Sequence, residues 1–337
     1  MSSALDEIAT CYRADGLAAA LDAVASLRSR RRTFRLAAGA VEAIFPVQRV
    51  AVELLEYSEL VGLHGLGKGS RQALVGWGVS PRVEASGSAW RVLADEPFLA
   101  FGNHPTGVEG ALFSALLRRE DVFFLAGSHV AQLAPSLASK VLPIERTRQE
   151  QRSSDALPRS RSPVHALSQK LWAPGGLTAA KQNREALDRA AQLVAEESAG
   201  VHVFPSGSTR TDGWRRGIGR IVCEITKMGD SATGRVFLVP VVYGVRPAHL
   251  MASKLFPAWS AAHVLSQALV WSSLGPPWIF IGHPRALSSL GLTRSTSPRE
   301  ATSAMSQLWS SAAAEAHASM PRWSPFERAH FARLRHL

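Results

Sequence analysis

The chain has 337 residues, of which 46% are hydrophobic and 19% charged, a balance that is typical of a folded globular protein and excludes wholesale disorder. Its net charge of +11 predicts attraction to anions such as nucleic acid, anionic lipid headgroups, phosphorylated substrates or acyl carriers. Its two cysteines, Cys11 and Cys223, match no metal-binding spacing, so we expect buried thiols in a reducing cytoplasm and no metal site.

No secretory signal and no membrane-spanning helix are expected from the sequence. Asp6 and Glu7 lie near the N-terminus, where a signal peptide would have an unbroken apolar core. The two longest apolar stretches, Leu36–Leu55 and Leu255–Ile281, are interrupted by polar residues or prolines. The second stretch is rich in tryptophan, which suits either a membrane–water boundary or a helix packed against the core.

The first 78 residues read as helical, because Ala and Leu dominate and apolar residues recur at three- and four-residue spacing. The basic run 28–35 is typical of a solvated helix end, in preference to an anion-binding patch. We therefore expect an N-terminal helical domain over residues 1–78. Its helices are expected over Ala4–Cys11, Gly16–Arg28, Thr33–Leu60 with a break near Pro46, and Ser70–Trp77.

After Pro81, short β-rich runs alternate with helical patterns, which predicts an α/β domain over residues 79–337 with a mixed, largely parallel sheet flanked by helices. Residues 148–176 are rich in Arg, Ser and Pro and are expected to form a long basic loop, either functional or poorly ordered. The expected strands are Phe98–Gly102, Val122–Ala126, Val201–Pro205, Val236–Tyr243 and Trp278–Ile281. The expected helices are Glu109–Arg118, His129–Lys140, Ala179–Ala199 and Trp214–Lys227.

The segment 98–110 carries the clearest chemical signal. A strand is expected to end at Gly102, followed by a polar turn with His104 and a helix that begins near Thr106. In an open α/β sheet the carboxyl ends of the strands line the ligand crevice, so His104 would face a substrate. Glu109 follows closely enough to bond the imidazole and stabilise its charged form. Amides at the helix N-terminus would be available to an oxyanion.

Both residues also have purely structural interpretations. A histidine in a turn, taken alone, is more typical of a backbone contact than of catalysis. The segment from Thr106 to Glu109 matches a capping box, in which Thr106 caps the helix and Glu109 returns to the Thr106 amide. The local sequence leaves the capping and the catalytic interpretations of Glu109 even.

Three further segments share the pattern of an apolar run that ends in polar or special residues. The strand in 201–210 runs into a small-residue turn that ends in Arg210, and such a turn can present amides and a guanidinium to a phosphate. The apolar run 142–146 ends in Arg146. The apolar strand 237–243 contains Pro240, which suggests an edge strand or a bulge.

These four segments, in this order, resemble the glycerol-phosphate acyltransferase superfamily, which includes lysophosphatidate and glycerol-3-phosphate acyltransferases. The family pattern is Asn-His-x-x-x-x-Asp, an apolar block ending in Arg, Phe-Pro-Glu-Gly-Thr-Arg and a Val-Pro-Val strand, and the resemblance covers residues 83–287. It implies an enzyme of phospholipid biosynthesis. Such an enzyme moves a fatty acyl group from acyl-coenzyme A or acyl carrier protein, without a further cofactor, to a hydroxyl of a glycerol phosphate or lysophospholipid.

The resemblance also implies roles for individual residues. His104 would be the catalytic base and Glu109 its carboxylate partner. Arg146 and a cation near Arg210 would hold the phosphate of the acceptor. The implied substrate-binding residues are Asn103, Thr106, Arg146, Ser206, Gly207, Ser208, Thr209 and Arg210.

Three departures from the family pattern bear on the substrate more than on the reaction. Glu109 replaces the usual Asp, and Ser206 stands where the family usually has Glu, although the soluble plastid-type enzymes have Pro-Ser-Gly there. Arg210 lies one residue later than the Arg of the family, so Arg215 or Arg216 is an alternative cation. Two other interpretations stay open: acylation of a specialised hydroxyl or amine acceptor, and a catalytically silent relative that binds acyl chains or membranes.

Other function classes fit less well. The segment 62–68 nearly matches a phosphate-binding P-loop, but Gly69 occupies the Ser/Thr position and the preceding residues look helical. The chain has no Gly-x-Ser-x-Gly elbow and no recognisable nucleic-acid-reading motif, so we expect no nucleic acid partner. We expect the protein in the cytoplasm, with peripheral, salt-sensitive binding to anionic lipid at the inner face of the membrane.

Overall fold

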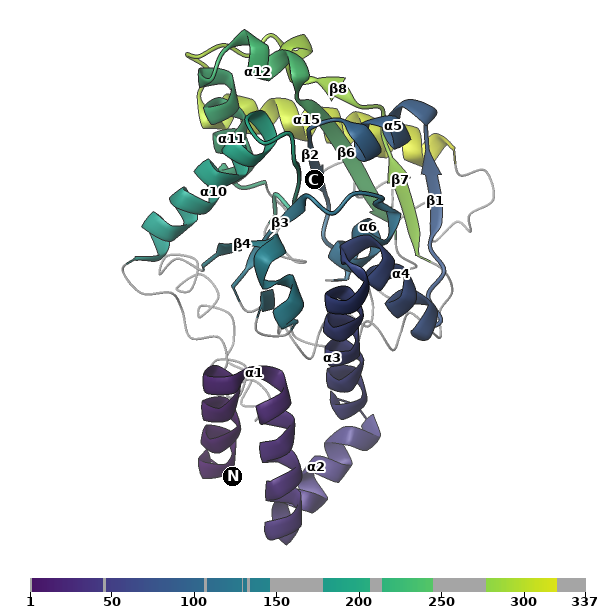
Figure 1. Ribbon diagram of the computed structural model, residues 1–337, viewed down its shortest axis with the longest axis vertical. Helices are drawn as coiled ribbons and strands as arrows, with labels where there is room; N and C mark the ends of the chain where they lie inside the picture. The colour runs from purple at the N-terminus through teal and green to yellow at the C-terminus, as the bar shows by residue number, and fades with distance from the viewer. Residues whose placement is uncertain are drawn as a thin grey trace.

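The computed structural model describes residues 2–44, 47–105, 108–128, 130–131, 134–145, 178–206, 214–244 and 277–319. Within these residues, none of the helices combines the length and the hydropathy needed to span a bilayer. Figure 1 shows a twisted sheet with helices on both faces and an elongated helical region at the N-terminal end.

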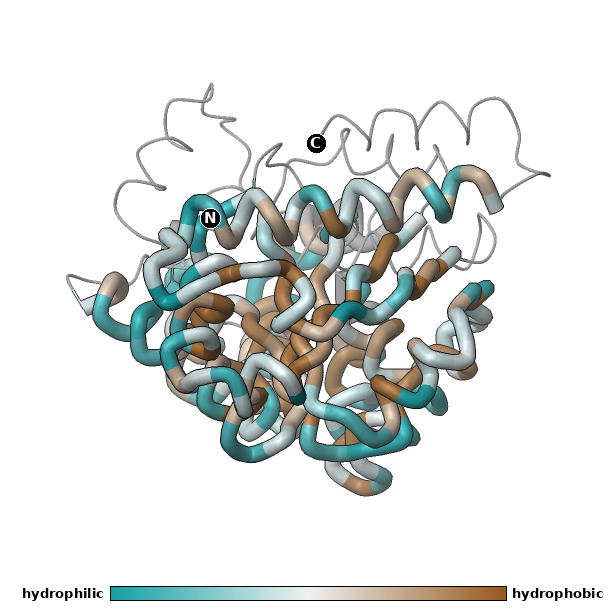
Figure 2. Tube along the Cα trace, turned by 90° about the horizontal axis from the view of Figure 1, so that it is seen from above, coloured by the Kyte–Doolittle hydropathy of each residue, from teal (hydrophilic) through white to brown (hydrophobic). Residues whose placement is uncertain are grey.

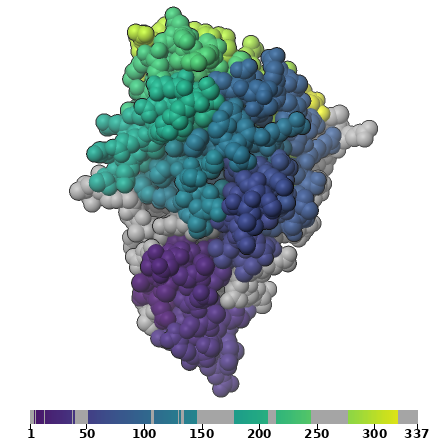
Figure 3. All heavy atoms as spheres, viewed as in Figure 1, coloured from purple at the N-terminus to yellow at the C-terminus, as the bar shows by residue number. Residues whose placement is uncertain are grey.

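The N-terminal region is helical, as the sequence predicts. Helix α1 (Ser2–Arg30) folds back on itself at Gly16, whose φ of 81° lies in the left-handed region that favours glycine. Its two halves pack against each other through a small cluster that includes Ile8, Tyr12 and Leu27. Figure 3 shows this region as a narrow lobe below the α/β part. The helices that follow are α2 (Arg32–Ile44), α3 (Val47–His64) and α4 (Leu66–Gly76).

The sheet is mixed and largely parallel, which confirms the predicted fold class. Its order is β1-β7-β6-β2-β5-β3-β4, with β8 beside β6. The central strand β2 is parallel to both of its neighbours, whereas β7 and β8 run antiparallel to β6. The strands are β1 (Arg82–Ala85), β2 (Phe98–Gly102), β3 (Val122–Gly127), β4 (Val141–Ile144), β5 (Gly200–Val203), β6 (Phe237–Gly244), β7 (Trp278–Ile281) and β8 (Arg285–Ala286).

Helices bury both faces of this sheet. On one face pack α10 (Ala179–Ala195), α11 (Gly217–Lys227) and α15 (Pro298–Ala318), and on the other α4, α5 (Gly87–Asp95) and α6 (Glu109–Leu116). A short helix, α12 (Asp230–Arg235), and a 3-10 turn, η2 (Leu287–Leu290), complete this part of the chain. Figure 2 shows the hydrophobic segments gathered in the interior and hydrophilic residues on the outer turns.

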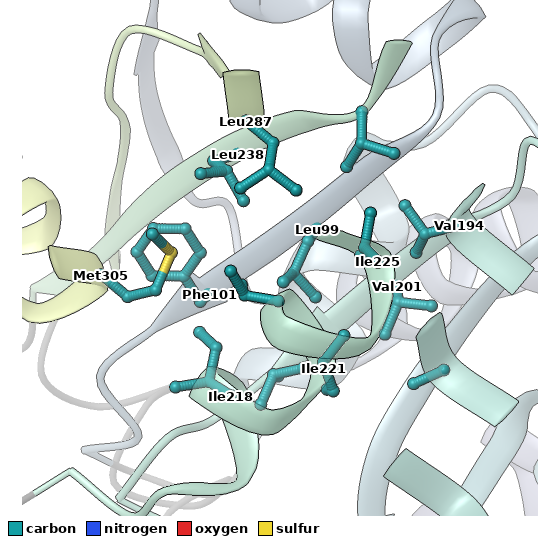
Figure 4. Close-up of a cluster of buried hydrophobic side chains, with 14 of the residues drawn as sticks. Leu99, Phe101, Val194, Val201, Ile218, Ile221, Ile225, Leu238, Leu287 and Met305 are labelled. Atoms are coloured by element: carbon teal, nitrogen blue, oxygen red, sulfur yellow. The ribbon is translucent and has the colours of Figure 1, made fainter. Parts of the chain in front are cut away.

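The side chains of β2 alternate between the two cores. Leu99 and Phe101 join the first core, where they meet Ile221 of α11 (Figure 4), and Phe98 and Ala100 join the second. Because both faces are buried, all five residues of the strand are apolar or small. This explains why the strand is readable from the sequence as a continuous apolar run.

The helical region and the sheet share a core. Tyr57 and Val61 of α3 and Leu74 of α4 belong to the same buried cluster as Phe113 of α6, whereas the cluster within α1 is separate. The boundary between two domains after residue 78 stays a prediction.

One local expectation needs correction. Where an α-helix was expected over 129–140, the residues Pro135–Lys140 form a 3-10 helix, η1, that leads directly into β4. For Pro240 the sequence predicts an edge strand or a bulge, and the structure has the bulge, in an interior strand. Three residues between Ile281 and Arg285 oppose two residues of β6, so the ladder bulges beside Pro240. The carbonyl of Pro240 accepts a hydrogen bond from Gly282 in this bulge, where a missing N–H costs no regular ladder bond.

Candidate active site

The candidate site lies at the edge of the sheet where β2, β5 and β6 end. Phe101 of β2 is in parallel register with Val203 of β5 and with Pro240 of β6. The residues that follow β2 and β5, Asn103–His104 and Phe204–Ser206, therefore leave the sheet side by side. This is the carboxyl edge, at which open α/β sheets bind their ligands.

His104 and Glu109 form a hydrogen-bonded pair at this edge. The distance from His104 Nδ1 to Glu109 Oε2 is 2.6 Å. The Glu109 side chain is fully buried, and the His104 side chain is 23% exposed. Because a carboxylate only accepts hydrogen bonds, Nδ1–H is the donor and Nε2 is left as the nitrogen that can accept a proton. The pair therefore has the arrangement of a general base oriented by a buried carboxylate.

The start of α6 distinguishes the two interpretations of Glu109. The helix begins at Glu109, as in the expected range 109–118 and not near Thr106, and its N-cap residue is Val108, with no side-chain cap. A capping box needs the carboxylate at the third helical position, whereas Glu109 occupies the first. At that position its carboxylate lies at the positive end of the helix dipole.

Asn103 holds the turn that carries His104. Its side-chain amide donates to the carbonyl of Tyr243 and its side-chain oxygen accepts from the amide of Tyr243, both at 2.8 Å. This reciprocal pair extends the ladder between β2 and β6 beyond Gly102 with a side chain in place of the backbone. The substrate-binding role expected for Asn103 stays a prediction.

A layer of aromatic rings lies behind His104. The Phe204 ring stacks on the imidazole, with centroids 4.2 Å apart and an interplanar angle of 21°. His202 lies deeper, with its ring 4.4 Å from Phe204 in an edge-to-face contact and 4.4 Å from Phe113 in a stacked contact. The hydroxyl of Tyr243 is 3.1 Å from Nε2 of His202. Sequence reasoning assigned no role to His202 or Tyr243, although a histidine inside an apolar strand is a recognisable signal.

Both inner polar rings are neutral near pH 7. Burial lowers the pKa of His202 to about 3, and the charge of His104 acts in the same direction. Burial also raises the pKa of Tyr243 well above its ordinary value, and the negative charge of Glu109 raises it further. His104 therefore stands beside two groups that keep their protonation state when it gains a proton.

The low pKa of His202 predicts a specific dependence of stability on pH. Its folded pKa of about 3 lies below the unfolded value of 6.5, so below that pH protons bind preferentially to the unfolded chain. We expect the His202 contribution to be constant above about pH 6.5 and the free energy of unfolding to fall by up to about 1.4 kcal/mol per pH unit between about pH 6 and pH 3. Urea titrations of wild type and His202→Phe across this range measure the effect. Equal slopes in the two proteins would contradict a buried neutral histidine.

Other sequence-predicted site residues are only partly placed. Ser206 is half-buried in the turn after β5, and the amide of Arg215 donates to the carbonyl of Pro205 at 2.9 Å, so the backbone of Arg215 lies beside that turn. Arg216 follows, and both arginines are exposed. Several expected features lie outside the described residues: Thr106, Arg146, Gly207, Ser208, Thr209, Arg210, the loop 148–176 and most of the tryptophan-rich stretch. In the part of the chain that is described, no group of three or more His, Cys, Asp or Glu side chains is placed to hold a metal.

The glycine-rich segment 62–69 serves helix packing. It joins α3 to α4, and the amide of Leu66 donates to a carboxylate oxygen of Glu120 at 2.7 Å, so the protein itself supplies the anion at the start of α4. A Cβ on Gly67 would lie 2.5 Å from the carbonyl oxygen of Leu117, and one on Gly69 would lie 2.6 Å from a backbone oxygen of α3. These glycines therefore allow close approach of helices, and the near-match to a P-loop has a structural explanation.

The fold and the site together define an α/β protein with a histidine–carboxylate pair at the carboxyl edge of a largely parallel sheet. No family model matches the chain. No curated protein matches it either. Among solved structures, the chain is similar to the 1-acyl-sn-glycerophosphate (LPA) acyltransferase PlsC from Thermotoga maritima, with 16% sequence identity and a TM-score of 0.39 over 80% of this chain and 81% of that chain. A function must therefore be argued from the residues of the site.

Proposed function

We propose that this protein is an acyltransferase that moves a fatty acyl group from an acyl thioester to a hydroxyl of a glycerol phosphate or a lysophospholipid. The observation that carries the proposal is the 2.6 Å hydrogen bond between a partly exposed His104 and a fully buried Glu109 at the carboxyl edge of the sheet. The order of the four sequence segments supports acyl transfer as the class of reaction.

The proposed reaction begins with proton transfer to His104. Nε2 takes the proton of the acceptor hydroxyl as its oxygen attacks the thioester carbonyl, and the charge of Glu109 stabilises the resulting imidazolium. Collapse of the tetrahedral intermediate forms the ester bond and breaks the carbon–sulfur bond. The departing sulfur then takes the proton from His104, so the base is regenerated and no protein nucleophile is needed.

The N-terminus of α6 is suited to the developing oxyanion. An α-helix leaves the amides of its first turn without partners inside the helix, and the N-cap residue Val108 makes no side-chain hydrogen bond to the turn that begins α6. Gly110 follows Glu109, and the position that a Cβ would take on it is open space. We assign the amides of this turn to the oxyanion, where preorganised donors commonly contribute about a hundred- to a thousandfold in rate.

The acceptor phosphate is assigned to the cations beyond β5. Arg215 and Arg216 are exposed and lie beside the Ser206 turn, and Arg146 and Arg210 are the cations implied by the sequence resemblance. A guanidinium makes charge-assisted and often bidentate bonds to phosphate. The same surface would repel a cationic acceptor, which favours the phosphorylated class over an amine.

A thiol-release assay tests this proposal, with acyl-coenzyme A and the acyl thioester of acyl carrier protein as alternative donors. We expect release that depends on a phosphorylated acceptor, and a KM for that acceptor raised about tenfold or more in Arg215→Ala, with slow thioester hydrolysis unchanged. Arg91→Ala, which removes an exposed arginine on α5, is the matched control. If single alanine variants of Arg146, Arg210, Arg215 and Arg216 all leave this KM unchanged, the acceptor carries no phosphate and the specialised-acceptor alternative replaces it.

A further inference from the structure

One hydrogen bond connects the rings behind His104 across the centre of the sheet. It joins the Tyr243 hydroxyl of β6 to Nε2 of His202 on β5 at 3.1 Å. The two strands lie on opposite sides of β2, so the bond crosses over that strand. Both side chains are buried, with exposed fractions of 1% for Tyr243 and 0% for His202.

The hydrogen bond between Tyr243 and His202 is called the bridge below. The sequence of β2 leaves room for it. A Cβ on Gly102 would lie 2.5 Å from the carbonyl oxygen of Val241 and 3.0 Å from Cε2 of Tyr243. A larger residue at Gly102 would therefore displace the tyrosine ring. Ala100, which is in register with His202, is also small. The path across β2 is therefore open because Ala100 and Gly102 lack bulk.

Both residues of the bridge are connected to His104 through direct contacts. At one end, the backbone of Tyr243 is held by Asn103, the residue directly before His104, through two hydrogen bonds of 2.8 Å. At the other end, the ring of His202 contacts Phe204 edge to face, and Phe204 stacks on the imidazole of His104. A shift of either bridge residue would therefore reach the imidazole through direct contacts.

The stability of the core does not by itself explain why the bridge is present. Nδ1 of His202 is buried and has no hydrogen-bond partner among the described residues, so the hydroxyl of Tyr243 holds the ring through Nε2 alone. Replacing both partners of such a bond by apolar rings of similar shape is nearly neutral or stabilising. A core that served stability alone would be as well filled by two phenylalanines.

We propose that Tyr243 and His202 are positioning residues: their hydrogen bond fixes Phe204, which holds the imidazole of His104 in line with Glu109. This inference rests on the proposed function for its kinetic test. The low pKa of His202 and the high pKa of Tyr243 keep the bridge neutral while His104 carries a proton, so the bridge does not compete with Glu109 for the imidazolium.

Kinetics of single and double variants separate positioning from stability. We expect Tyr243→Phe to lower kcat about ten- to a hundredfold with little change in KM, because small misplacements of a catalytic group have effects of that size. The double variant Tyr243→Phe/His202→Phe leaves no unpaired polar atom in the bridge, so it should regain the melting temperature of wild type and keep the low kcat. A wild-type kcat in either variant would overturn the proposal. Tyr57→Phe is the matched control, since it removes another buried tyrosine hydroxyl, bonded to Ser70, outside the site.

A second measurement does not depend on acyl transfer. A ring stacked on Phe204 has its proton resonances shifted by the ring current, and the His104 resonances are identified by their loss in His104→Gln. We expect Tyr243→Phe to move these resonances toward the positions seen in Phe204→Leu. Unchanged His104 resonances in folded Tyr243→Phe overturn the positioning role, even if the wild-type protein transfers no acyl group. A shift in a protein without acyl transfer supports the positioning role and rejects only the proposed function.

Discussion

The variant His104→Ala is expected to lose acyl transfer by about a hundred- to ten-thousandfold, the range typical for removal of a general base. This change removes Nε2, the atom that accepts the proton of the acceptor hydroxyl in the proposed mechanism. The fold should persist, because the imidazole lies in a turn at the sheet edge and is 23% exposed. Initial rates with saturating acyl thioester, together with the melting temperature of the variant, measure both parts of this expectation.

A second histidine–glutamate pair provides the control for this experiment. His283 Nε2 lies 3.3 Å from Glu315 Oε1, but its side chain is 61% exposed, so the pair is solvated and far less constrained than His104 with Glu109. His283→Ala should leave the rate of acyl transfer unchanged. A His104→Ala variant that folds and retains the wild-type rate would end the mechanism proposed for this site.

Glu109→Gln is expected to lower kcat by about a hundred- to ten-thousandfold, with a smaller effect on stability. The amide keeps the size of the buried side chain but has no charge to stabilise the imidazolium. It can also donate to Nδ1, which would place the proton on Nε2 and remove the base. Glu109→Asp keeps the charge but shortens the side chain by one methylene, so it should break the 2.6 Å contact and lose activity to an intermediate degree.

The control for Glu109 is Glu120, a glutamate whose carboxylate contacts the start of another helix. Glu120 accepts from the Leu66 amide at the beginning of α4. Glu120→Gln should lower the melting temperature and leave kcat unchanged, as expected of a residue that only stabilises a helix end. If Glu109→Gln behaves in the same way as Glu120→Gln, Glu109 has a structural role alone.

Local sequence patterns were sufficient for the strands that build the site. The strand β2 is buried on both faces of the sheet, with Leu99 in one core and Phe98 in the other, and such burial produces apolar runs that stand out between helical segments. Other elements were not anticipated, among them β1, α5 and α15. The start of α15 has a capping box between Ser297 and Glu300, a signal that is readable in the sequence.

The sequence by itself determined which residues follow the strands and in what order, and so it pointed to His104, Glu109 and Ser206. Only the tertiary structure decided that the Glu109 carboxylate meets the imidazole and does not cap the helix. Only the tertiary structure revealed the bridge from Tyr243 to His202, whose partners are 41 positions apart. Local periodicity reports which face of a helix or strand is buried, whereas contacts between strands depend on the order of strands in the sheet. That order places β2 between β5 and β6, and it results from the packing of the whole domain, which no short segment encodes.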